Sequence, residues 1–359
     1  MGRLADLGSN RGRQNGVSNS SKLFAIGNPL LDISVTEGAE KLLSQYALKS
    51  NDAILAGPEH TAIYEQVRTT LKPLYLAGGA GQNTARAASY VLPAGSVVYT
   101  GSVGSDNFAN TLREANDKEG VESAYYVRQD TPTGACCVLI TGHDRSLVTN
   151  LAAAQEFSVD HLRTPQMKQR MDEASHFYIG GFFLTHGIES ALEVAKHSSQ
   201  SGKTLAFNLS APFIPQFFKD QVDQLIPYAD IVFGNESEAE AYAQSHGLED
   251  TSAKGVAKHI ANLSKTNSGK DRIVVITQGA LETVVAVGDK SLTSFPVSPL
   301  SKDAIVDTNG AGDATAGGFI AAFVLGSPIP ECVQLGHKLG ALCIQQNGPQ
   351  LPYPKQNLL

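Results

Sequence analysis

A run that reads DTNGAGDATAGGF begins at Asp307 and places a glycine-rich turn and a carboxylate at the start of an apolar, helix-like segment. In this arrangement Gly310, Ala311 and Gly312 present unpaired backbone N–H groups at a helix N-terminus, where the helix dipole also favours an anion. The carboxylate of Asp313 lies beside that site, where it would repel a bound anion, so its presence there suggests a functional role. Accepting a proton from a hydroxyl that attacks a phosphoryl group is such a role. The alternative is an ordinary N-cap aspartate.

Two segments in the first quarter of the chain contain groups that suit the hydroxyls of a sugar. GNPLLD contains Asn28 and Asp32, and a carboxylate can accept hydrogen bonds from two adjacent hydroxyls, as in a ribose diol. GGAGQN begins with Gly78 and Gly79, which let the backbone approach a ligand closely, and its glutamine or Asn83 can donate and accept toward hydroxyls. The alternatives are a turn asparagine with a surface aspartate, and a tight strand-to-helix turn.

Other polar side chains suit a metal ion and phosphate. The motif GNESE supplies Asn235 and Glu238, whose oxygens can hold hydrated Mg²⁺ directly or through water. Its alternative is a capped helix start with acidic residues in the first turn. Arg145 lies in the turn of a predicted hairpin, where it can clamp phosphate when a lid closes. The alternative for Arg145 is a solvated loop residue.

Three phenylalanines, Phe182, Phe183 and Phe213, fall in segments that follow predicted strands. Aromatic faces at such positions can stack on a base. Packing in the core is the alternative, and we favour it for Phe182. His337, on the last predicted helix, is more typical of a packed or surface histidine than of a ligand.

Short apolar runs typical of strands alternate with segments of helical period, which indicates βαβ units and a parallel sheet covered on both faces. The predicted strands are 23–26, 74–77, 97–100, 136–141, 176–179, 204–209, 230–233, 272–277 and 283–287. The predicted helices are 83–92, 107–119, 187–200, 236–246, 251–264, 314–325 and 331–346. The polar segments above follow predicted strands, and ligands bind beyond the carboxyl ends of strands in open parallel sheets. Parts of 29–77, together with a predicted hairpin at 130–150, break the alternation and predict a small β-rich lid.

Composition narrows the class of protein. The chain has 359 residues, a net charge of −7 and no long basic run, which argues against nucleic acid or an anionic membrane as a partner. Its four cysteines lack zinc spacing and fit a reducing compartment. No apolar stretch reaches the ~20 residues that a membrane helix needs. Residues 1–21 are polar, lack a signal-peptide core and are expected to be disordered, so we expect a cytoplasmic protein.

Taken together, the motifs resemble those of the ribokinase/PfkB-type carbohydrate kinases, and within that family the kinases that act on adenosine. The resemblance runs from Leu23 to about Pro354 and is carried by GNPLLDIS, GGAGQNTAR, PTGACC, RSLVTNLAAA, GGFFLT, NLSAPFI, GNESEA, TQG and DTNGAGDA. It implies a three-layer ribokinase-like α/β fold over 22–359, with a mostly parallel central sheet and a β-rich lid. It implies transfer of the ATP γ-phosphoryl group to the 5′-hydroxyl of adenosine, which gives AMP and ADP in purine salvage and uses Mg²⁺. It also implies a monomeric enzyme in the cytoplasm, with presence in the nucleus compatible with the resemblance.

The resemblance also implies a role for each matching residue. Asp313 is the base, Gly310, Ala311 and Gly312 form the anion hole, and Arg145 reaches from the lid toward the phosphates. The ribose is held by Asn28, Asp32, Gly78, Gly79 and Asn83, and the adenine slot is lined by Leu30, Leu147, Phe183 and Phe213. Asn235 and Glu238 organise Mg²⁺ and its waters. The ATP site contains Thr277, Gly279, Asn309 and His337.

Two positions depart from the family pattern. Ala53 stands where relatives often carry glutamine, and Thr315 stands where they usually carry phenylalanine. The first bears on base preference, and the second on packing behind the predicted catalytic helix. A related sugar or nucleoside kinase is the alternative enzyme. An inactive nucleoside-binding regulatory protein on the same fold is the alternative of another class, although the complete DTNGAGD segment argues against it.

Overall fold

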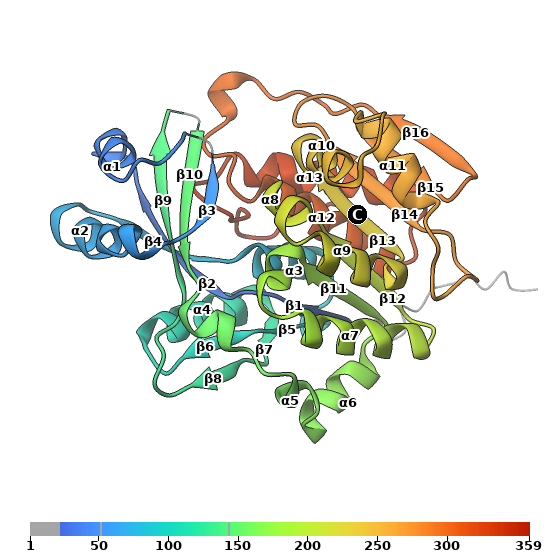
Figure 1. Cartoon of the computed structure of the whole chain (residues 1–359), viewed down its shortest axis with the longest axis horizontal. Coiled ribbons are helices and arrows are strands. Elements are labelled where there is room, and N and C mark those ends of the chain that lie inside the picture. Colours follow the sequence, from blue (N-terminus) through green and yellow to red (C-terminus); the bar gives the residue numbers. More distant parts are fainter. Residues whose placement is uncertain (1–21, 51, 143) are drawn as a thin grey trace, which may run out of the picture.

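The computed structural model describes residues 22–50, 52–142 and 144–359, so the predicted disordered tail, 1–21, lies outside the described residues. Within them, a nine-stranded sheet runs in the order β16-β15-β14-β13-β12-β11-β1-β5-β7 (Figure 1). Neighbours from β14 to β7 are parallel, and β15 and β16 are antiparallel. The strands are β1 (Leu23–Ile26), β5 (Val97–Thr100), β7 (Val121–Ser123), β11 (His176–Gly180), β12 (Thr204–Asn208), β13 (Ile231–Asn235), β14 (Ile273–Thr277), β15 (Thr283–Val287) and β16 (Ser291–Phe295).

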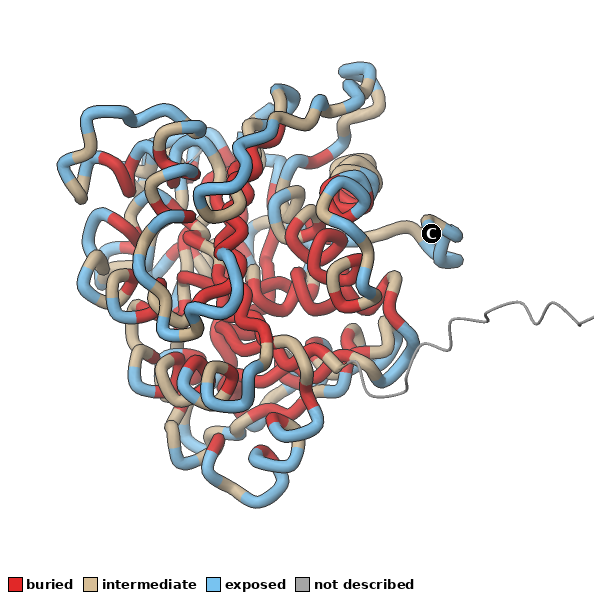
Figure 2. Tube along the Cα trace, turned by 90° about the vertical axis from the view of Figure 1, so that its right-hand side faces the viewer, coloured by how far each residue is buried: buried red, intermediate tan, exposed pale blue. Residues whose placement is uncertain are grey.

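Helices cover both faces of this sheet, because successive strand residues point to opposite faces. In β1, Phe24 and Ile26 enter the core on one side, and Leu23 and Ala25 enter the core on the other. The first core is closed by α5 (Val159–Leu162), α6 (Pro165–Glu173), α7 (Ile188–Gln200), α8 (Phe213–Phe217), α9 (Lys219–Leu225), α10 (Glu236–His246) and α11 (Ala253–Ala261). The second is closed by α3 (Ala80–Val91), α4 (Asn107–Glu119), α12 (Ala311–Val324) and α13 (Ile329–Cys343). The predicted three-layer fold is therefore confirmed, and buried stretches run through its middle (Figure 2).

A second sheet of five strands, all from described residues, stands beside the first in the order β3-β10-β9-β2-β4. Its strands are β2 (Leu30–Val35), β3 (Ala53–Leu55), β4 (Leu74–Gly78), β9 (Ala135–Thr141) and β10 (Asp144–Asn150). Two helices, α1 (Ala39–Gln45) and α2 (Ala62–Thr70), cover its outer face around a separate core. These strands come from the two segments expected to form a lid, and their movement as a lid stays a prediction. A small parallel pair, β6 (Ser102–Gly104) and β8 (Tyr126–Arg128), completes the strands.

GNPLLD follows β1, and its last three residues begin strand β2 within the segment expected to form the lid. One prediction about this second sheet was wrong. The strand before GGAGQN, β4, pairs antiparallel with β2 and is not part of the central sheet. The sequence pattern did not decide which sheet holds 74–77, because short apolar strands of both sheets have the same composition.

The N-terminus of α12 is positioned by close packing of the helix against α3 and α13. A Cβ on Gly317 would lie 2.6 Å from the Cβ of Ala87 and 2.6 Å from the carbonyl oxygen of Thr84. A Cβ on Gly318 would lie 2.8 Å from the carbonyl oxygen of Leu335. Only glycine permits these approaches, which set where the DTNGAGD turn lies. None of the helices built from described residues has both the length and the apolar character needed to cross a membrane.

We expect Gly317→Ala to destabilise the fold by about 1–2 kcal/mol, because the overpacking cost exceeds the ~1 kcal/mol that alanine gains over glycine in a helix. Gly312→Ala is the matched control in the same helix, since a Cβ there meets no heavy atom within 4 Å. Thermal unfolding of both variants measures the difference. A Gly317→Ala variant as stable as Gly312→Ala would contradict this account of how α12 is packed.

Candidate active site

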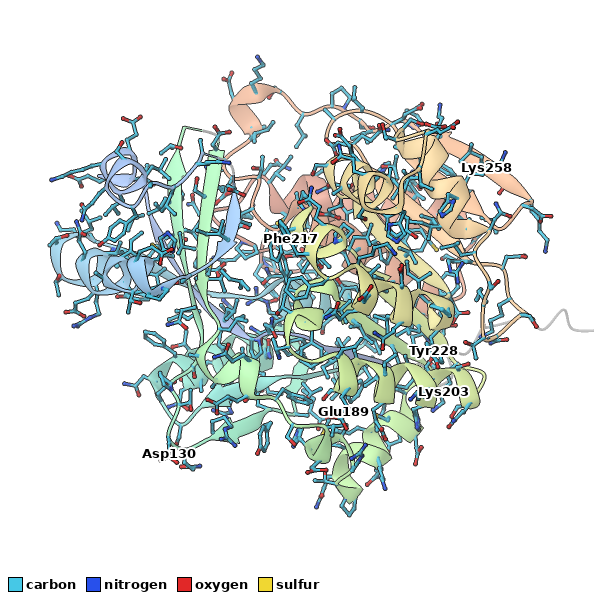
Figure 3. All side chains as sticks on the ribbon, in the orientation of Figure 1. Asp130, Glu189, Lys203, Phe217, Tyr228 and Lys258 are labelled. Carbon is cyan, nitrogen blue, oxygen red and sulfur yellow. The ribbon has the colours of Figure 1, made fainter. Side chains whose placement is uncertain are left out.

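A cavity of about 1030 Å³ lies between the second sheet and the carboxyl ends of the central strands. One of its lining residues, Phe217, is 77% exposed (Figure 3). The cavity brings together most of the residues predicted from the sequence. They are Asn28, Leu30, Asp32, Gly79, Asn83, Arg145, Leu147, Phe183, Phe213, Asn235, Glu238, Thr277, Asn309, Gly310, Ala311, Gly312 and Asp313. Ala53 and Thr315, the two departures from the family pattern, also border it.

Three of the predicted residues, all of them described, do not line this cavity. Gly78 lies behind Asp32, where a Cβ would come within 2.2 Å of the carboxylate. Gly279 lies in the turn after β14 with a φ of +56°. His337 shares a hydrogen bond of 2.8 Å with the hydroxyl of Thr283, and burial lowers its pKa. His337 is thus half-buried and hydrogen-bonded to β15, and its place in the ATP site stays a prediction.

The predicted glycine turn stands at the start of α12. Gly310 caps the helix with a φ of 79°, so that Asp313 is the third helical residue. The N–H of Ala311 is engaged by the carbonyl oxygen of Thr308 at 3.3 Å. Among the described residues, the N–H groups of Gly312 and Asp313 have no partner. Two donors and the positive end of the helix dipole therefore face the cavity.

Among the described residues, one side chain donates a hydrogen bond to the carboxylate of Asp313. Asn83 Nδ2 donates to Asp313 Oδ2 at 3.0 Å, and Arg86 Nη2 donates to Asn83 Oδ1 at 2.7 Å. Burial raises the pKa of Asp313 to about 7, against the hydrogen bond from Asn83 and the charge of Arg86, which lower it. A carboxyl group with a pKa near neutrality is suited to accept a proton in a reaction.

The charge of Arg86 also acts on a second carboxyl group, that of Asp32. Burial raises its pKa to about 7, the charge of Arg86 opposes this shift, and Asp313 adds to it. The charge of Asp313 raises the pKa of Asp32 because two carboxylates repel each other. The cavity therefore holds more potential negative charge than the protein itself neutralises, which favours a ligand that donates hydrogen bonds or brings cations.

Two charged residues of the site were missed or misplaced by sequence reasoning. Arg86 is 3% exposed, and besides Asn83 it donates to the carbonyl oxygens of Ala77 and Pro349. Its position three residues after Asn83 on a helix was the available signal. Arg145 is not in the hairpin turn but in β10, and its Nε donates to Asp307 Oδ1 at 2.7 Å. Because both partners are buried, this ion pair ties the second sheet to the DTNGAGD turn.

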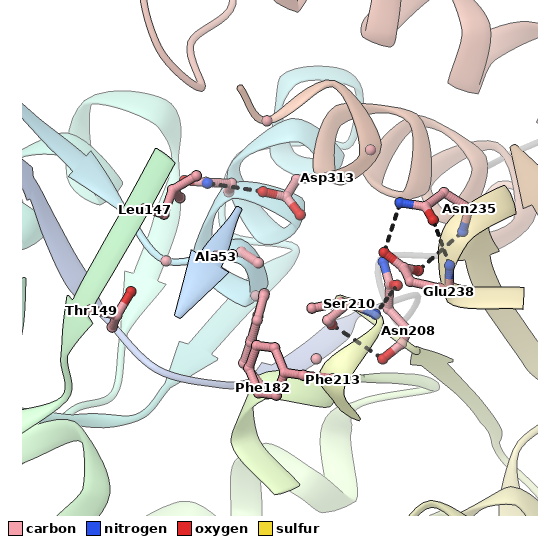
Figure 4. A pocket seen from close by; sticks show the side chains of 18 of the residues that line it. Ala53, Leu147, Thr149, Phe182, Asn208, Ser210, Phe213, Asn235, Glu238 and Asp313 are labelled. Atoms are coloured by element: carbon pink, nitrogen blue, oxygen red, sulfur yellow. Dashed lines mark hydrogen bonds between the residues drawn. The ribbon is translucent and has the colours of Figure 1, made fainter. Parts of the chain in front are cut away.

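The aromatic side chains beside the cavity are not placed as the sequence predicted. Phe183 borders the cavity, but its side chain is fully buried in the core, with its ring 5.6 Å from that of Phe157. Phe182 packs only at the edge of that core, and its ring lies 5.8 Å from that of Phe213 (Figure 4). Residues 181–185 form a 3₁₀ helix, in which successive side chains point in different directions. This turn sends Phe183 inward and leaves Phe182 as the ring beside Phe213.

Asn235 and Glu238 form the capping box of α10. Asn235 Oδ1 accepts from the N–H of Glu238 at 2.8 Å, and Glu238 Oε2 accepts from the N–H of Asn235 at 3.0 Å (Figure 4). The helix-cap alternative is thus part of the structure, although both residues also line the cavity. Burial raises the pKa of Glu238 to about 7. Among the described residues, no group of three or more His, Cys, Asp or Glu side chains could hold a metal ion.

Removing the buried charge of Asp32 is expected to stabilise the ligand-free protein. The unfolded chain loses this proton near pH 4 and the folded protein only near pH 7, so folding stability falls as pH rises through that range. We expect Asp32→Asn to raise the free energy of unfolding at pH 8 by on the order of 1 kcal/mol or more, and by much less at pH 5. Asp289→Asn, at an exposed turn, is the control. An Asp32→Asn variant that is less stable than the unmodified protein at pH 8 would refute this.

Comparison with known proteins agrees with this geometry. Residues 41–356 match the pfkB family of carbohydrate kinases. The adenosine kinase of Schizophyllum commune is 50% identical, with 95% of this chain and 99% of the relative covered. The adenosine kinase of Schizosaccharomyces pombe is 46% identical, with 93% and 97% covered.

Solved structures show the same likeness. The adenosine kinase of Anopheles gambiae, in complex with P1,P4-di(adenosine-5) tetraphosphate, superposes with a TM-score of 0.88 at 39% identity, over 92% of this chain and 98% of that one. The adenosine kinase of Schistosoma mansoni, in complex with 2-fluoroadenosine, gives 0.87 at 36% identity, over 92% and 97%. The chain therefore belongs to the pfkB family of carbohydrate kinases and, within it, to the adenosine kinases.

Proposed function

We propose that this protein is an ATP-dependent kinase that transfers the γ-phosphoryl group to the 5′-hydroxyl of adenosine and releases AMP and ADP. The observation that carries the proposal is the position of Asp313, a buried carboxyl group with a pKa near 7 beside free N–H groups at the start of α12. The cavity, at about 1030 Å³, has room for a nucleoside and a nucleotide together. The likeness to adenosine kinases supports the choice of substrate.

In the proposed mechanism the protein positions the reactants and stabilises charge. Asp313 accepts the proton of the attacking 5′-hydroxyl as the oxygen–phosphorus bond forms. The N–H groups of Gly312 and Asp313, in the Gly310–Asp313 turn, donate to the oxygens of the transferring phosphoryl group. Asn83 holds the carboxylate of Asp313 in place and donates only one hydrogen bond to it, so the other oxygen stays free for the substrate.

The ribose is assigned to the side of the cavity formed by β2 and the start of α3. Asp32 accepts from the diol, and Asn28 and Asn83 offer both donors and acceptors. Gly79 has a φ of +87°, and a Cβ there would lie 2.2 Å from the carbonyl oxygen of Asn28. The glycine therefore lets two segments of backbone meet under the sugar.

The base is assigned to the apolar wall formed by Leu30, Leu147, Phe182 and Phe213, with Phe182 in place of Phe183. Such a wall gains stacking energy from a purine and nothing from a free sugar. It is therefore the feature that favours a nucleoside over ribose or another small sugar.

ATP is assigned to the opposite side, where Thr277 and Asn309 border the cavity. Asn235 and Glu238 fit a hydrated Mg²⁺ held mostly by nucleotide oxygens, because their amide and carboxyl oxygens are hard ligands and the buried Glu238 has no cationic partner among the described ion pairs. When bound, the ion would neutralise charge on the phosphates. The cytoplasmic location, the nuclear presence and the monomeric state expected from the sequence stay predictions.

The proton acceptor can be tested by a change that keeps its shape. We expect Asp313→Asn to lower kcat by roughly 10²-fold or more, because the amide cannot take the proton, while the Kd for adenosine changes little. In the unmodified protein kcat/KM should rise with pH through about 7, as the carboxyl group loses its proton, and then level off. Steady-state kinetics between pH 5.5 and pH 9 measures both effects. Near-normal turnover by the Asn variant would remove Asp313 from this role.

The aromatic wall can be tested by offering adenosine and ribose separately. We expect Phe182→Ala to weaken adenosine binding about 10-fold, through the loss of ~1–3 kcal/mol of stacking, with little effect on the KM for ATP. Phe183→Leu is the matched control and should lower the melting temperature while adenosine affinity stays near normal. If the unmodified protein phosphorylated ribose as efficiently as adenosine, the sugar-kinase alternative would replace this proposal.

A further inference from the structure

Behind the ribose side of the cavity, the side-chain amide of Asn28 is held from both ends. Its Nδ2 donates to the carbonyl oxygen of Phe182 at 3.2 Å, and its Oδ1 lies 2.9 Å from Nε2 of His186. A backbone carbonyl oxygen can only accept, so the contact with Phe182 fixes which end of the amide is the nitrogen. The oxygen of the amide must then face the imidazole.

The proton on the imidazole follows from the same contacts. Because Oδ1 of Asn28 can only accept, Nε2 of His186 carries the hydrogen. Burial lowers the pKa of His186 to about 4, so that the ring is neutral near pH 7 and Nε2–H is its single donor. Nδ1 is then an acceptor, and no described residue donates to it.

That lone acceptor is informative about why a histidine is present. His186 follows the 3₁₀ turn that contains Phe182 and packs its ring 5.2 Å from that of Phe183. It also borders a second cavity of about 510 Å³ next to Ser158 and Ser190. A buried acceptor without a partner lowers stability, and an apolar side chain of similar size would avoid this cost. The contribution of the imidazole therefore lies in its Nε2–H and the asparagine that it orients.

The amide of Asn28 keeps unused capacity on its cavity side. One N–H of Nδ2 bonds to Phe182, and one lone pair of Oδ1 accepts from His186, so one donor and one acceptor stay free. Without the imidazole, only the contact with Phe182 would resist rotation of the amide. The donor and the acceptor would then no longer point in one fixed direction.

We propose that His186 is a positioning residue for the nucleoside. Its Nε2–H holds the Asn28 amide in the orientation that presents one N–H and one lone pair to the ribose, and the Asn28–Phe182 contact links this orientation to the wall that faces the base. The inference rests on the proposed function in one respect only, namely that the ribose of a nucleoside lies on this side of the cavity. His186 acts through Asn28 and does not itself line the cavity.

The test is a pair of substitutions at His186 combined with Asn28→Ala, read out as the Kd for adenosine by calorimetry. His186→Met removes the donor and should weaken binding about 5- to 10-fold, as expected for one lost hydrogen bond. His186→Gln places an amide N–H at a similar reach and should recover affinity to within about 3-fold of the unmodified protein. In the Asn28→Ala background His186→Met should cause no further loss, because the two residues act as one unit. Melting temperatures show whether each variant is folded.

A second measurement does not depend on any variant. The ring signals of His186 in nuclear magnetic resonance spectra should show a neutral Nε2–H tautomer at pH 7. An unchanged Kd in His186→Met, an equal loss in the Asn28→Ala background, or an Nδ1–H tautomer would overturn the inference. If the unmodified protein binds adenosine but does not phosphorylate it, the proposed function fails and this inference stands on the binding data. If adenosine does not bind at all, both fail.

Discussion

The rest of the site depends on the interactions of one buried guanidinium group, that of Arg86. Asp32 and Asp313 are two of the buried carboxyl groups in the cavity, and the charge of Arg86 lowers the pKa of both against the effect of burial. The same side chain bonds to Asn83, to the carbonyl oxygen of Ala77 at the end of β4, and to that of Pro349 near the C-terminus. Arg86 therefore compensates buried negative charge, and it also joins the second sheet, α3 and the C-terminal segment.

Two of the asparagines that line the cavity, Asn28 and Asn83, are oriented in the same way. Arg86 donates to the amide oxygen of Asn83, which turns the amide nitrogen toward Asp313. His186 contacts the amide oxygen of Asn28, which keeps the amide nitrogen on the carbonyl oxygen of Phe182. In each case a side chain outside the reaction centre decides which end of an amide faces inward. Such an arrangement lowers the reorganisation needed when a substrate binds.

The sequence predicted those features that depend on neighbouring residues. The glycine turn with Asp313, the capping box of α10 and the alternation of strands and helices are local patterns, and the structure contains all three. The features that the sequence did not predict depend on contacts between distant segments. The partner of Arg145 is 162 residues away, and Arg86 meets Pro349 across 263 residues. The place of β4 in the second sheet, as the antiparallel neighbour of β2, was missed for the same reason, because composition carries no information about which strands become neighbours.

Phe182 and Phe183 are neighbours in the chain, yet one contributes to the ligand cavity and the other to the hydrophobic core. One ring packs in the core and the next borders the cavity, and only the short turn at 181–185 assigns them. A deletion or insertion of one residue just before this turn would exchange the two rings and would also shift His186 away from Asn28. Length variation among homologous enzymes should therefore be excluded from this segment, although it is a connection outside the regular sheet, where such variation is usual.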